Sequence, residues 1–349
     1  MICCGAWRPT LSEPVIALDA LGLDRGPEEA VEAAAAMSLV GGIHVVLVGP
    51  SDALGAYLSE RRYDPAWVTI RHAADAVEMH ERPREALERK PNATIAVAMR
   101  MLADGEAHGL VTAGHTGGAI VAASTHLTLI PGIKRAALAT VFPSQRRHGL
   151  NNDPFTLALD VGATVEADAE TLHSFAHMGA AYCRIISKTD APAVALLSNG
   201  AEATKGPPNI VAANRLLSAD NTLHFVGNIE GLDIPTGRAN VVVTDGFTGN
   251  IVLKLFEGMG DTLRQAAKYA ARNKMAWRAG MALLSGGIKQ IREVTDWREY
   301  GGAPLLGFSH LIIKAHGRSG ARALGNAIKV AAKSHRDGLV PRISEAMNR

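Results

Sequence analysis

The side chains of this chain that are best suited to catalysis or ligand binding follow short apolar segments or precede helix-forming ones. They are Asp19, Asp24, Asp160, Glu202, Lys205, Asp245, Asn250, Lys314 and His316. Carboxylates, lysines, an amide and an imidazole orient a phosphate group and stabilise an oxyanion when they lie together. Taken singly, each has an ordinary explanation as a helix cap, a turn residue or a solvated loop residue. The pattern indicates a site of mixed charge if the fold gathers these residues at one sheet edge.

Two glycine-rich turns share the pattern T-x-G-x-T-G. Residues 112–117 (TAGHTG) and 244–249 (TDGFTG) each follow an apolar segment and lead into an apolar helical segment. A strand, a glycine turn and a helix start leave backbone N–H groups available to an anion. The alternative is that the glycines only permit tight turns, but the likeness of the two turns favours phosphate binding. The candidate ligands are Gly114, His115, Thr116, Gly117, Gly246, Phe247, Thr248 and Gly249.

Known nucleotide and metal motifs are missing from the sequence. Neither turn is a Walker A sequence, and the first strand–helix unit has 22–26 (GLDRG) where a dinucleotide-binding protein has G-x-G-x-x-G. The 13 histidines show no H-E-x-x-H or similar metal-binding spacing. We therefore expect no metal and no cofactor.

Continuous apolar segments alternate with alanine-rich helical ones along most of the chain. The apolar segments are 15–18, 43–48, 68–70, 110–112, 157–159, 194–197 and 241–244. This alternation is typical of a mostly parallel sheet covered by helices on both faces, in which ligands bind at the carboxyl ends of the strands. We predict a three-layer α/β/α fold: an N-terminal extension over 1–14, a single catalytic domain over 15–335, and a C-terminal tail over 336–349.

Residues 260–295 are expected to form a helical hairpin that leaves the sheet. Its tip combines Lys274, Trp277 and Arg278 with methionines and leucines. Such an amphipathic, basic tip suits an anionic membrane surface or an acidic partner protein, and an ordinary dimer interface is the alternative.

Composition narrows the class of protein. The chain has 349 residues, a formal net charge of +2, and 20% charged residues, so we expect a folded, soluble protein that binds no nucleic acid. Three cysteines, Cys3, Cys4 and Cys183, and an N-terminus without a long apolar core favour a reducing, cytoplasmic location. The uncharged stretch 107–133 contains proline and several glycines, and is expected to form a strand, a glycine turn and a buried helix rather than a membrane span.

The order of these segments resembles the bacterial phosphate acyltransferase family, the acyl-carrier-protein:phosphate transacylases, over nearly the whole chain. The matching passages are 18–24 (LDALGLD), 113–118 (AGHTGG), 159–163 (LDVGA), 202–206 (EATKG), 225–230 (FVGNIE), 242–250 (VVTDGFTGN), 300–303 (YGGA) and 314–317 (KAHG). The passage 242–250 is the most specific of them. Several positions depart from the family pattern: Leu23 replaces glycine, Arg25 histidine, His115 asparagine, Gly118 alanine and Thr164 asparagine, and Arg318 interrupts a serine pair.

The resemblance implies a homodimeric fold related to phosphotransacetylases and isocitrate dehydrogenase. It also implies conversion of acyl-acyl carrier protein and inorganic phosphate into acyl phosphate for phospholipid synthesis. We assign phosphate binding to the amides of 114–118 and 246–250 with Lys205, orientation to Asp245 and Asn250, and oxyanion stabilisation to His316. Asp19, Asp24, Asp160 and Lys314 complete the expected substrate site.

Other activities also suit the sequence. The departures leave room for a paralogue that uses another acyl group, in which His115 adds a donor or base. A phosphotransacetylase-like enzyme acting on acyl-coenzyme A, a metal-dependent dehydrogenase of the same fold, and a non-catalytic protein that binds acyl carriers or lipids are further alternatives. The expected protein is cytoplasmic, with peripheral contact at the inner face of the membrane.

Overall fold

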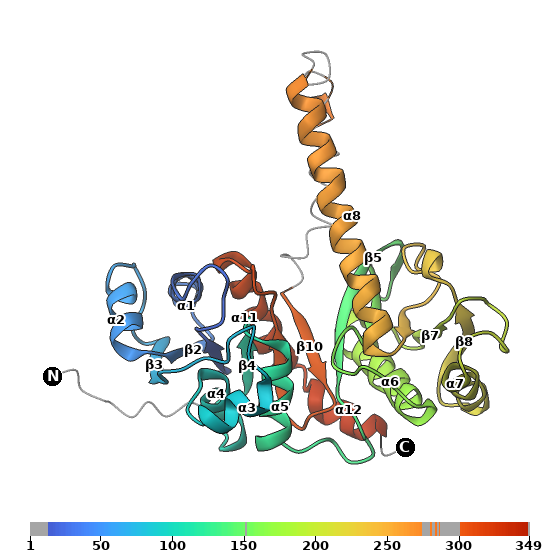
Figure 1. Ribbon diagram of the computed structural model, residues 1–349, viewed down its shortest axis with the longest axis horizontal. Helices are drawn as coiled ribbons and strands as arrows, with labels where there is room; N and C mark the ends of the chain where they lie inside the picture. Colours follow the sequence, from blue (N-terminus) through green and yellow to red (C-terminus); the bar gives the residue numbers. More distant parts are fainter. Residues whose placement is uncertain are drawn as a thin grey trace. The chain divides into compact units, whose positions relative to one another are not determined.

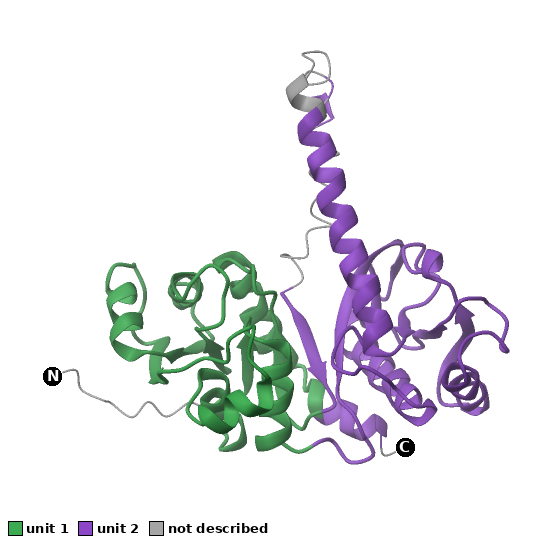
Figure 2. Ribbon diagram, viewed as in Figure 1, with its two compact units in different colours: residues 1–128, 308–340 green, residues 129–307, 341–349 purple. Residues whose placement is uncertain are grey.

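The computed structural model describes residues 13–150, 152–273, 280, 283–284, 286 and 301–347. The chain divides into two compact units (Figure 2). The first comprises residues 1–128 and 308–340, and the second comprises residues 129–307 and 341–349. The predicted single domain over 15–335 stays a prediction.

The first unit is built on five parallel strands. They are β1 (Val15–Asp19), β2 (His44–Gly49), β3 (Val68–His72), β4 (Gly109–Thr112) and β11 (Leu311–Lys314), in the order β3-β2-β1-β4-β11. Every residue of β1, β2 and β4 is buried, because helices cover both faces of a parallel sheet. The register places Asp19, Thr112 and Lys314 side by side at the carboxyl ends of β1, β4 and β11, as predicted for Asp19.

Two groups of helices contact the strands of the first unit. One group contains α1 (Glu28–Ser38), α2 (Ser51–Ser59) and α11 (Ala321–Arg336), and the other contains α3 (Pro83–Arg89), α4 (Thr94–Ala103) and α5 (Thr116–His126). Within each group the helices pack on one another, and Figure 1 shows the groups on opposite sides of the strands. This layering positions the turn between β4 and α5.

The second unit has six strands in the order β10-β5-β6-β9-β7-β8. They are β5 (Ala137–His148), β6 (Asp153–Leu159), β7 (Ala193–Leu197), β8 (His224–Ile229), β9 (Val241–Val243) and β10 (Ala303–Leu306). β5 is antiparallel to β10 and β6, and the remaining pairs are parallel. The helical elements are α6 (Ala169–Tyr182), the π-helical turn η1 (Cys183–Ser187), α7 (Pro208–Ala219), the short 3₁₀ helix η2 (Gly231–Asp233) and α8 (Gly246–Asn273). A last helix, α12 (Leu339–Met347), lies in the predicted C-terminal tail.

The predicted class of fold is confirmed: a mostly parallel sheet with helices on both sides. All seven predicted apolar segments overlap strands, but β5, β8, β10 and β11 were missed. β5 was missed because proline and a polar run, 143–148 (PSQRRH), interrupt its apolar pattern.

The uncharged stretch 107–133 forms β4, the glycine turn and α5, which confirms that prediction. Among the helices that the structure describes, none is long and apolar enough to cross a membrane. The first part of the expected hairpin belongs to the 28-residue helix α8.

Candidate functional site

In the first unit, a chain of hydrogen bonds begins at the glycine turn and ends on a buried carboxylate. The Gly114 amide donates to Thr112 Oγ1 at 3.2 Å, and the Thr112 hydroxyl donates to Asp19 Oδ2 at 2.8 Å. The Leu21 amide donates to the other oxygen, Asp19 Oδ1, at 3.3 Å. Asp19 therefore links the turn after β1 to the turn after β4.

Asp19 is only 2% exposed. Burial raises the pKa of Asp19, and hydrogen bonds from Thr94, Thr112 and the Leu21 amide and the charge of Lys314 act in the opposite direction. Its place under the turn suits positioning of the backbone better than direct contact with substrate. A cavity of about 10 Å³, lined by Asp19, Thr94, Thr112, Gly114 and other residues of this unit, has room for about one water molecule.

His115 caps helix α5. Its Nδ1 accepts a hydrogen bond from the Gly118 amide at 3.2 Å, and its carbonyl accepts from the Ala119 amide at 2.9 Å. In the neutral ring, the proton then lies on Nε2. The amides of Thr116 and Gly117 belong to the first turn of α5 and have no acceptor within the helix. With no acidic residue in its first turn, this helix start favours an anion.

Neighbouring segments approach the glycines of this turn closely, most of all at Gly22. A Cβ on Gly22, whose φ is +77°, would lie 2.8 Å from Gly114 Cα. A Cβ on Gly117 would lie 3.0 Å from Pro83 Cγ at the start of α3, and one on Gly118 would lie 3.4 Å from Val77. The segment that contains Val77 and Pro83 thus forms one wall of the turn.

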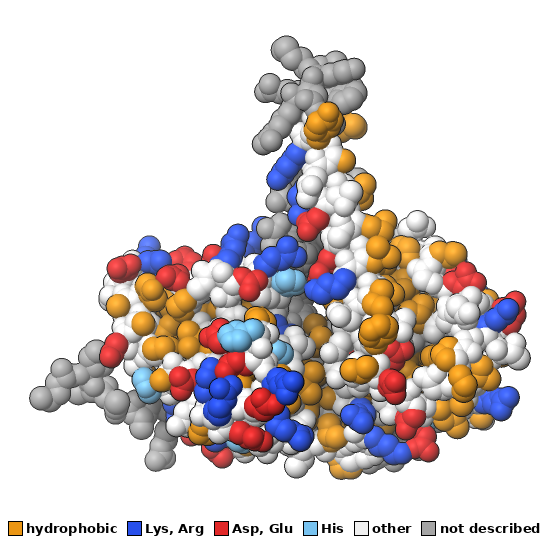
Figure 3. Space-filling model, viewed as in Figure 1, with side chains coloured by type: hydrophobic (Ala, Val, Ile, Leu, Met, Phe, Trp, Pro, Cys, Tyr) orange, Lys and Arg blue, Asp and Glu red, His pale blue; other side chains and the backbone are white. Residues whose placement is uncertain are grey.

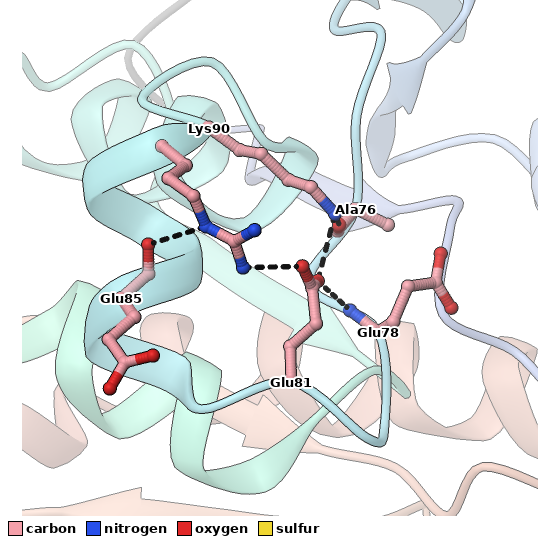
Figure 4. A network of polar contacts seen from close by, with 6 residues as sticks. Ala76, Glu78, Glu81, Glu85 and Lys90 are labelled. Atoms are coloured by element: carbon pink, nitrogen blue, oxygen red, sulfur yellow. Dashed lines mark hydrogen bonds and ion pairs between the residues drawn. The ribbon is translucent and has the colours of Figure 1, made fainter.

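A network of hydrogen bonds and ion pairs stabilises the segment that contains Val77 and Pro83 (Figure 4). Lys90 Nζ lies 2.8 Å from Glu81 Oε2 and donates to the Ala76 carbonyl at 3.0 Å. The Glu78 amide also donates to Glu81 Oε2, at 2.9 Å, and Arg89 Nη2 lies 3.1 Å from Glu81 Oε1. The Lys90 hydrogen bond is the main cause that lowers the pKa of Glu81, so the carboxylate is ionised and holds residues 76–90 in place beside the turn.

Asp24 lies against the turn that follows β11. Its amide donates to the Gly317 carbonyl at 3.0 Å, and a Cβ on Gly317 would lie 3.1 Å from both carboxylate oxygens. In the same turn, His316 Nδ1 accepts from the Arg318 amide at 3.1 Å, so the neutral ring carries its proton on Nε2. Asp24 and His316 are thus brought to adjacent turns, with Lys314 at the end of β11.

In the second unit, Asp160 is fully buried and accepts several hydrogen bonds. The amides of Leu138, Gly162, Ala163 and Thr164 and the Thr164 hydroxyl donate to its carboxylate at 2.6–3.0 Å. Burial raises the pKa of Asp160, and these hydrogen bonds favour the ionised form. Its oxygens are used inside the protein, so we assign Asp160 to shaping the turn rather than to contact with substrate.

The turn before α8 packs directly on Asp160. A Cβ on Gly249 would lie 1.9 Å from the Asp160 carbonyl oxygen, and one on Gly246 would lie 2.5 Å from Asp160 Oδ2. Asp245 is placed as the cap of α8, because its Oδ1 accepts from the Thr248 amide at 2.8 Å and its Oδ2 accepts from the Thr248 hydroxyl at 2.9 Å. The glycines of this turn are therefore required by packing.

The two T-x-G-x-T-G turns differ in structure. α5 begins at Thr116, the fifth residue of its pattern, whereas α8 begins at Gly246, the third residue of its own. In the second turn the amides of Gly246, Thr248 and Gly249 already donate to the Thr164 hydroxyl, the Asp245 carboxylate and the Asp245 carbonyl. Three of the amides expected to bind phosphate in the second turn are thus paired within the protein, as are those of Gly114 and Gly118 in the first.

Lys205 lies exposed on the loop after β7. The loop is held by the Lys205 amide, which donates to the Glu202 carbonyl, and by the Asn228 side chain, which donates to the same carbonyl at 2.9 Å. In the parts of the chain that the structure describes, no ion pair joins Lys205 to a carboxylate. Phe247 and Asn250 are also exposed, and Asn250 lies 3.9 Å from the position of a Cβ on Gly162.

Sequence reasoning missed Thr94, Thr112 and Thr164 as supporting residues. Thr112 stands first in a repeated pattern, which was the available signal, whereas Thr94 comes from α4 and carries no local signal. Lys274, Trp277 and Arg278 lie outside the described residues. Metal-ligating side chains converge elsewhere in the second unit, where His173, His177 and Asp220 lie together. Sequence reasoning also missed the spacing of the two histidines, which is that of the histidines in H-E-x-x-H.

Comparisons with known proteins agree over nearly the whole chain. A family model described as "Fatty acid synthesis protein" matches residues 15–342. The phosphate acyltransferase of Heliobacterium modesticaldum is 39% identical over 331 residues, which are 95% of this chain and 96% of that protein. That of Dictyoglomus turgidum is 37% identical over 335 residues, or 96% and 98% of the two chains. A phosphotransacetylase from Streptococcus pyogenes has the same fold, with a TM-score of 0.59 and 17% identity, covering 96% of this chain and 95% of its own.

Proposed function

The chain belongs to the phosphate acyltransferase family, and from this premise we propose that it transfers an acyl group from an acyl carrier protein thioester to inorganic phosphate. Acyl transfer to phosphate is the activity that gives the family its name. The observation that carries the proposal is the identity of 37% to the Dictyoglomus turgidum relative over 96% of this chain. That the acyl donor is a thioester of acyl carrier protein is a further part of our proposal.

The reaction needs alignment more than strong acid–base catalysis. A phosphate oxygen attacks the thioester carbonyl carbon, a tetrahedral oxyanion forms, and the C–S bond breaks to give acyl phosphate and the carrier thiolate. The thiolate leaves readily because thiols ionise near pKa 8.5. Phosphate is itself the nucleophile, so the protein has to hold it near the carbonyl and stabilise the oxyanion.

We assign phosphate binding to the turn before α5. The Thr116 and Gly117 amides lie at a helix start without acidic residues, and the Asp19–Thr112 hydrogen bond fixes the backbone before them. In the same unit, His316 donates from Nε2 to the oxyanion, because its Nδ1 accepts from the Arg318 amide. Asp24 and Lys314 support the turns that carry these donors.

We also assign Lys205, Asp245 and Asn250 of the second unit to the reaction. Lys205 is an exposed cation on a loop fastened by Asn228, which suits a phosphate ligand. Asp245 acts by fixing the start of α8, and so it sets the position of the exposed residues Phe247 and Asn250.

Trapping of acyl phosphate with hydroxylamine tests the proposal. The purified chain is incubated with phosphate and either acyl-acyl carrier protein or acyl-coenzyme A over a range of acyl lengths. We expect phosphate-dependent product with the carrier thioester, and a loss of about 10²- to 10³-fold in Lys205→Ala. Lys329→Ala removes an exposed lysine from α11 and is the control. Absence of product with every thioester would refute acyl transfer, and turnover of coenzyme A thioesters alone would refute the carrier protein as donor.

We propose that the protein is a homodimer that pairs through α8. Phe247, Ile251, Leu255, Met259 and Leu263 recur at every fourth position and are 53–69% exposed. Apolar side chains line α8 in the space-filling view (Figure 3). A continuous row of exposed apolar side chains is typical of an interaction site. A second copy of the same helix offers a complementary apolar surface.

We propose that the basic segment around Trp277 contacts the acidic carrier protein or an anionic membrane. The proposal rests on the sequence of this segment, which combines Lys274 and Arg278 with apolar residues. Trp277→Ala/Arg278→Ala should weaken binding to the carrier protein or to vesicles that contain anionic lipid, and added salt should weaken the wild-type binding. Unchanged binding to both would refute it.

A further inference from the structure

We propose that His173, His177 and Asp220 form a binding site for a zinc-class divalent cation. His173 and His177 lie four residues apart on α6, so their rings project from the same face of the helix. Asp220 directly follows α7, which packs on α6. The three side chains all lie in the second unit, and none of them is a residue that we assign to acyl transfer.

The three side chains converge on a small volume. Nε2 of His173 and Nε2 of His177 each lie 2.8 Å from Asp220 Oδ2, and the ligand atoms of the three residues lie within 4.8 Å of one another. Ligand atoms around a tetrahedral zinc ion, bound at about 2.0–2.1 Å, are separated by roughly 3.3 Å. Small rotations of the side chains would therefore admit the ion between the three atoms.

The carboxylate is already oriented for this role. Asp220 Oδ1 accepts hydrogen bonds from the Thr222 amide at 2.8 Å and the Thr222 hydroxyl at 2.6 Å, which leaves Oδ2 directed at the two histidines. Hydrogen bonds to the distal atom of a ligand are the usual way in which proteins hold metal ligands in place.

The donor set selects the class of ion. Two imidazole nitrogens and one carboxylate oxygen suit zinc, nickel or copper, whereas magnesium and calcium prefer oxygen ligands. The side chains of His173, His177 and Asp220 are 31%, 16% and 13% exposed, so the cation has access to the site and water can supply a fourth ligand.

The experiment measures zinc and cobalt(II) binding by the full chain without an affinity tag. Cys3→Ser/Cys4→Ser is the background, so that thiolates do not contribute. Calorimetry with zinc should show one site per chain, and cobalt(II) should give the absorption of tetrahedral coordination. We expect His173→Gln, His177→Gln and Asp220→Asn each to weaken binding by about 100-fold or more, because loss of a supporting residue alone costs about 10- to 100-fold.

Two further variants make the result specific. Thr222→Val removes the hydroxyl that orients Asp220 and should weaken binding by about 10- to 100-fold, and this variant keeps the test open if a ligand variant does not fold. His224→Gln removes an exposed imidazole of the same unit and should leave the affinity unchanged. Equal losses in His224→Gln and His177→Gln, or equal competition by magnesium, would overturn the proposal. Absence of a zinc site in the background protein would also do so, and the three side chains would then only tie α6 to α7.

Discussion

His115 stands where the related family usually has asparagine, and it performs the task that asparagine performs at a helix start. Its Nδ1 accepts the Gly118 amide at 3.2 Å. Thr164, another replacement of asparagine, donates to Asp160 Oδ2 and accepts from the Gly246 amide. Arg25 pairs with Glu29 at 3.4 Å, and Glu29 in turn accepts from the Ala321 amide at the start of α11. At the scale of single residues, His115 and Thr164 thus make hydrogen bonds that hold turns, whereas Arg25 pairs with a residue of α1.

His115→Asn should therefore leave both activity and stability nearly unchanged, since asparagine is a good helix cap. His115→Ala should lower the free energy of unfolding by about 1 kcal/mol, because the cap is lost. Urea denaturation and the hydroxylamine assay measure the two effects. If His115→Asn lost about 10²-fold in activity while remaining stable, the imidazole would be an acid–base catalyst and our assignment would be wrong.

At the scale of elements, the two matched turns show how one pattern produces two structures. Asp245 is a strong helix cap at the second position of its turn, so α8 begins immediately after it. Ala113 at the equivalent position has no side chain that can cap a helix, and α5 begins two residues later in its pattern, after His115. As a result, the Thr116 and Gly117 amides in the first turn of α5 have no acceptor within that helix.

Gly249→Ala should destabilise the protein by roughly 3 kcal/mol, because the added Cβ would lie 1.9 Å from the Asp160 carbonyl oxygen. Gly258→Ala in the same helix is the matched control. Apart from the nearby backbone of α8 itself and the adjacent residues, no described heavy atom lies within 4 Å of the position of its Cβ, and the change should stabilise α8 by up to about 1 kcal/mol. Denaturation in urea compares the two variants, and equal effects would show that Gly249 does not pack against the Asp160 turn.

Helix α6 provides a pH-dependent prediction. Asp168 caps this helix, and hydrogen bonds from Thr171, including its amide at 2.8 Å, lower the pKa of Asp168. A carboxyl group whose pKa is lower in the folded state stabilises the protein above its unfolded-state pKa, about 3.9, and this contribution is lost as the pH falls through the folded-state pKa.

Asp168→Ala should thus cost about 1 kcal/mol at pH 7, and the difference from wild type should shrink at acidic pH. Asp168→Asn keeps a cap without a charge and should show a smaller loss at pH 7. The free energies of unfolding of the three proteins, measured from pH 7 down to acidic pH, test this prediction. A difference between Asp168→Ala and wild type that does not change with pH would contradict it.

At the scale of the whole molecule, the exposed apolar residues of α8 predict self-association. Leu255→Asp/Met259→Asp should yield monomers, because each change places a charge in the apolar contact. Leu232→Asp is the control, since Leu232 is an exposed leucine of the same unit outside α8. Sedimentation or light scattering reports the mass, and a monomeric wild-type protein would refute the proposed dimer.

The sequence by itself determined the class of fold and the places where polar residues follow strands. Continuous apolar segments mark buried parallel strands, and residues such as Asp19 and Asp160 come directly after them. These features are local, so a pattern of residue types predicts them. The family was also evident from the order of its motifs, which run from 18–24 to 314–317.

Only the tertiary structure decided which of those polar residues are available for chemistry. Asp160 and Asp245 look alike in the sequence, yet one is fully buried under several donors and the other caps a helix. Thr94 reaches Asp19 from α4, and Asp220 meets His173 and His177 from another helix. The physical reason is that burial and hydrogen-bond partners depend on segments far apart in the chain, and no local pattern encodes them.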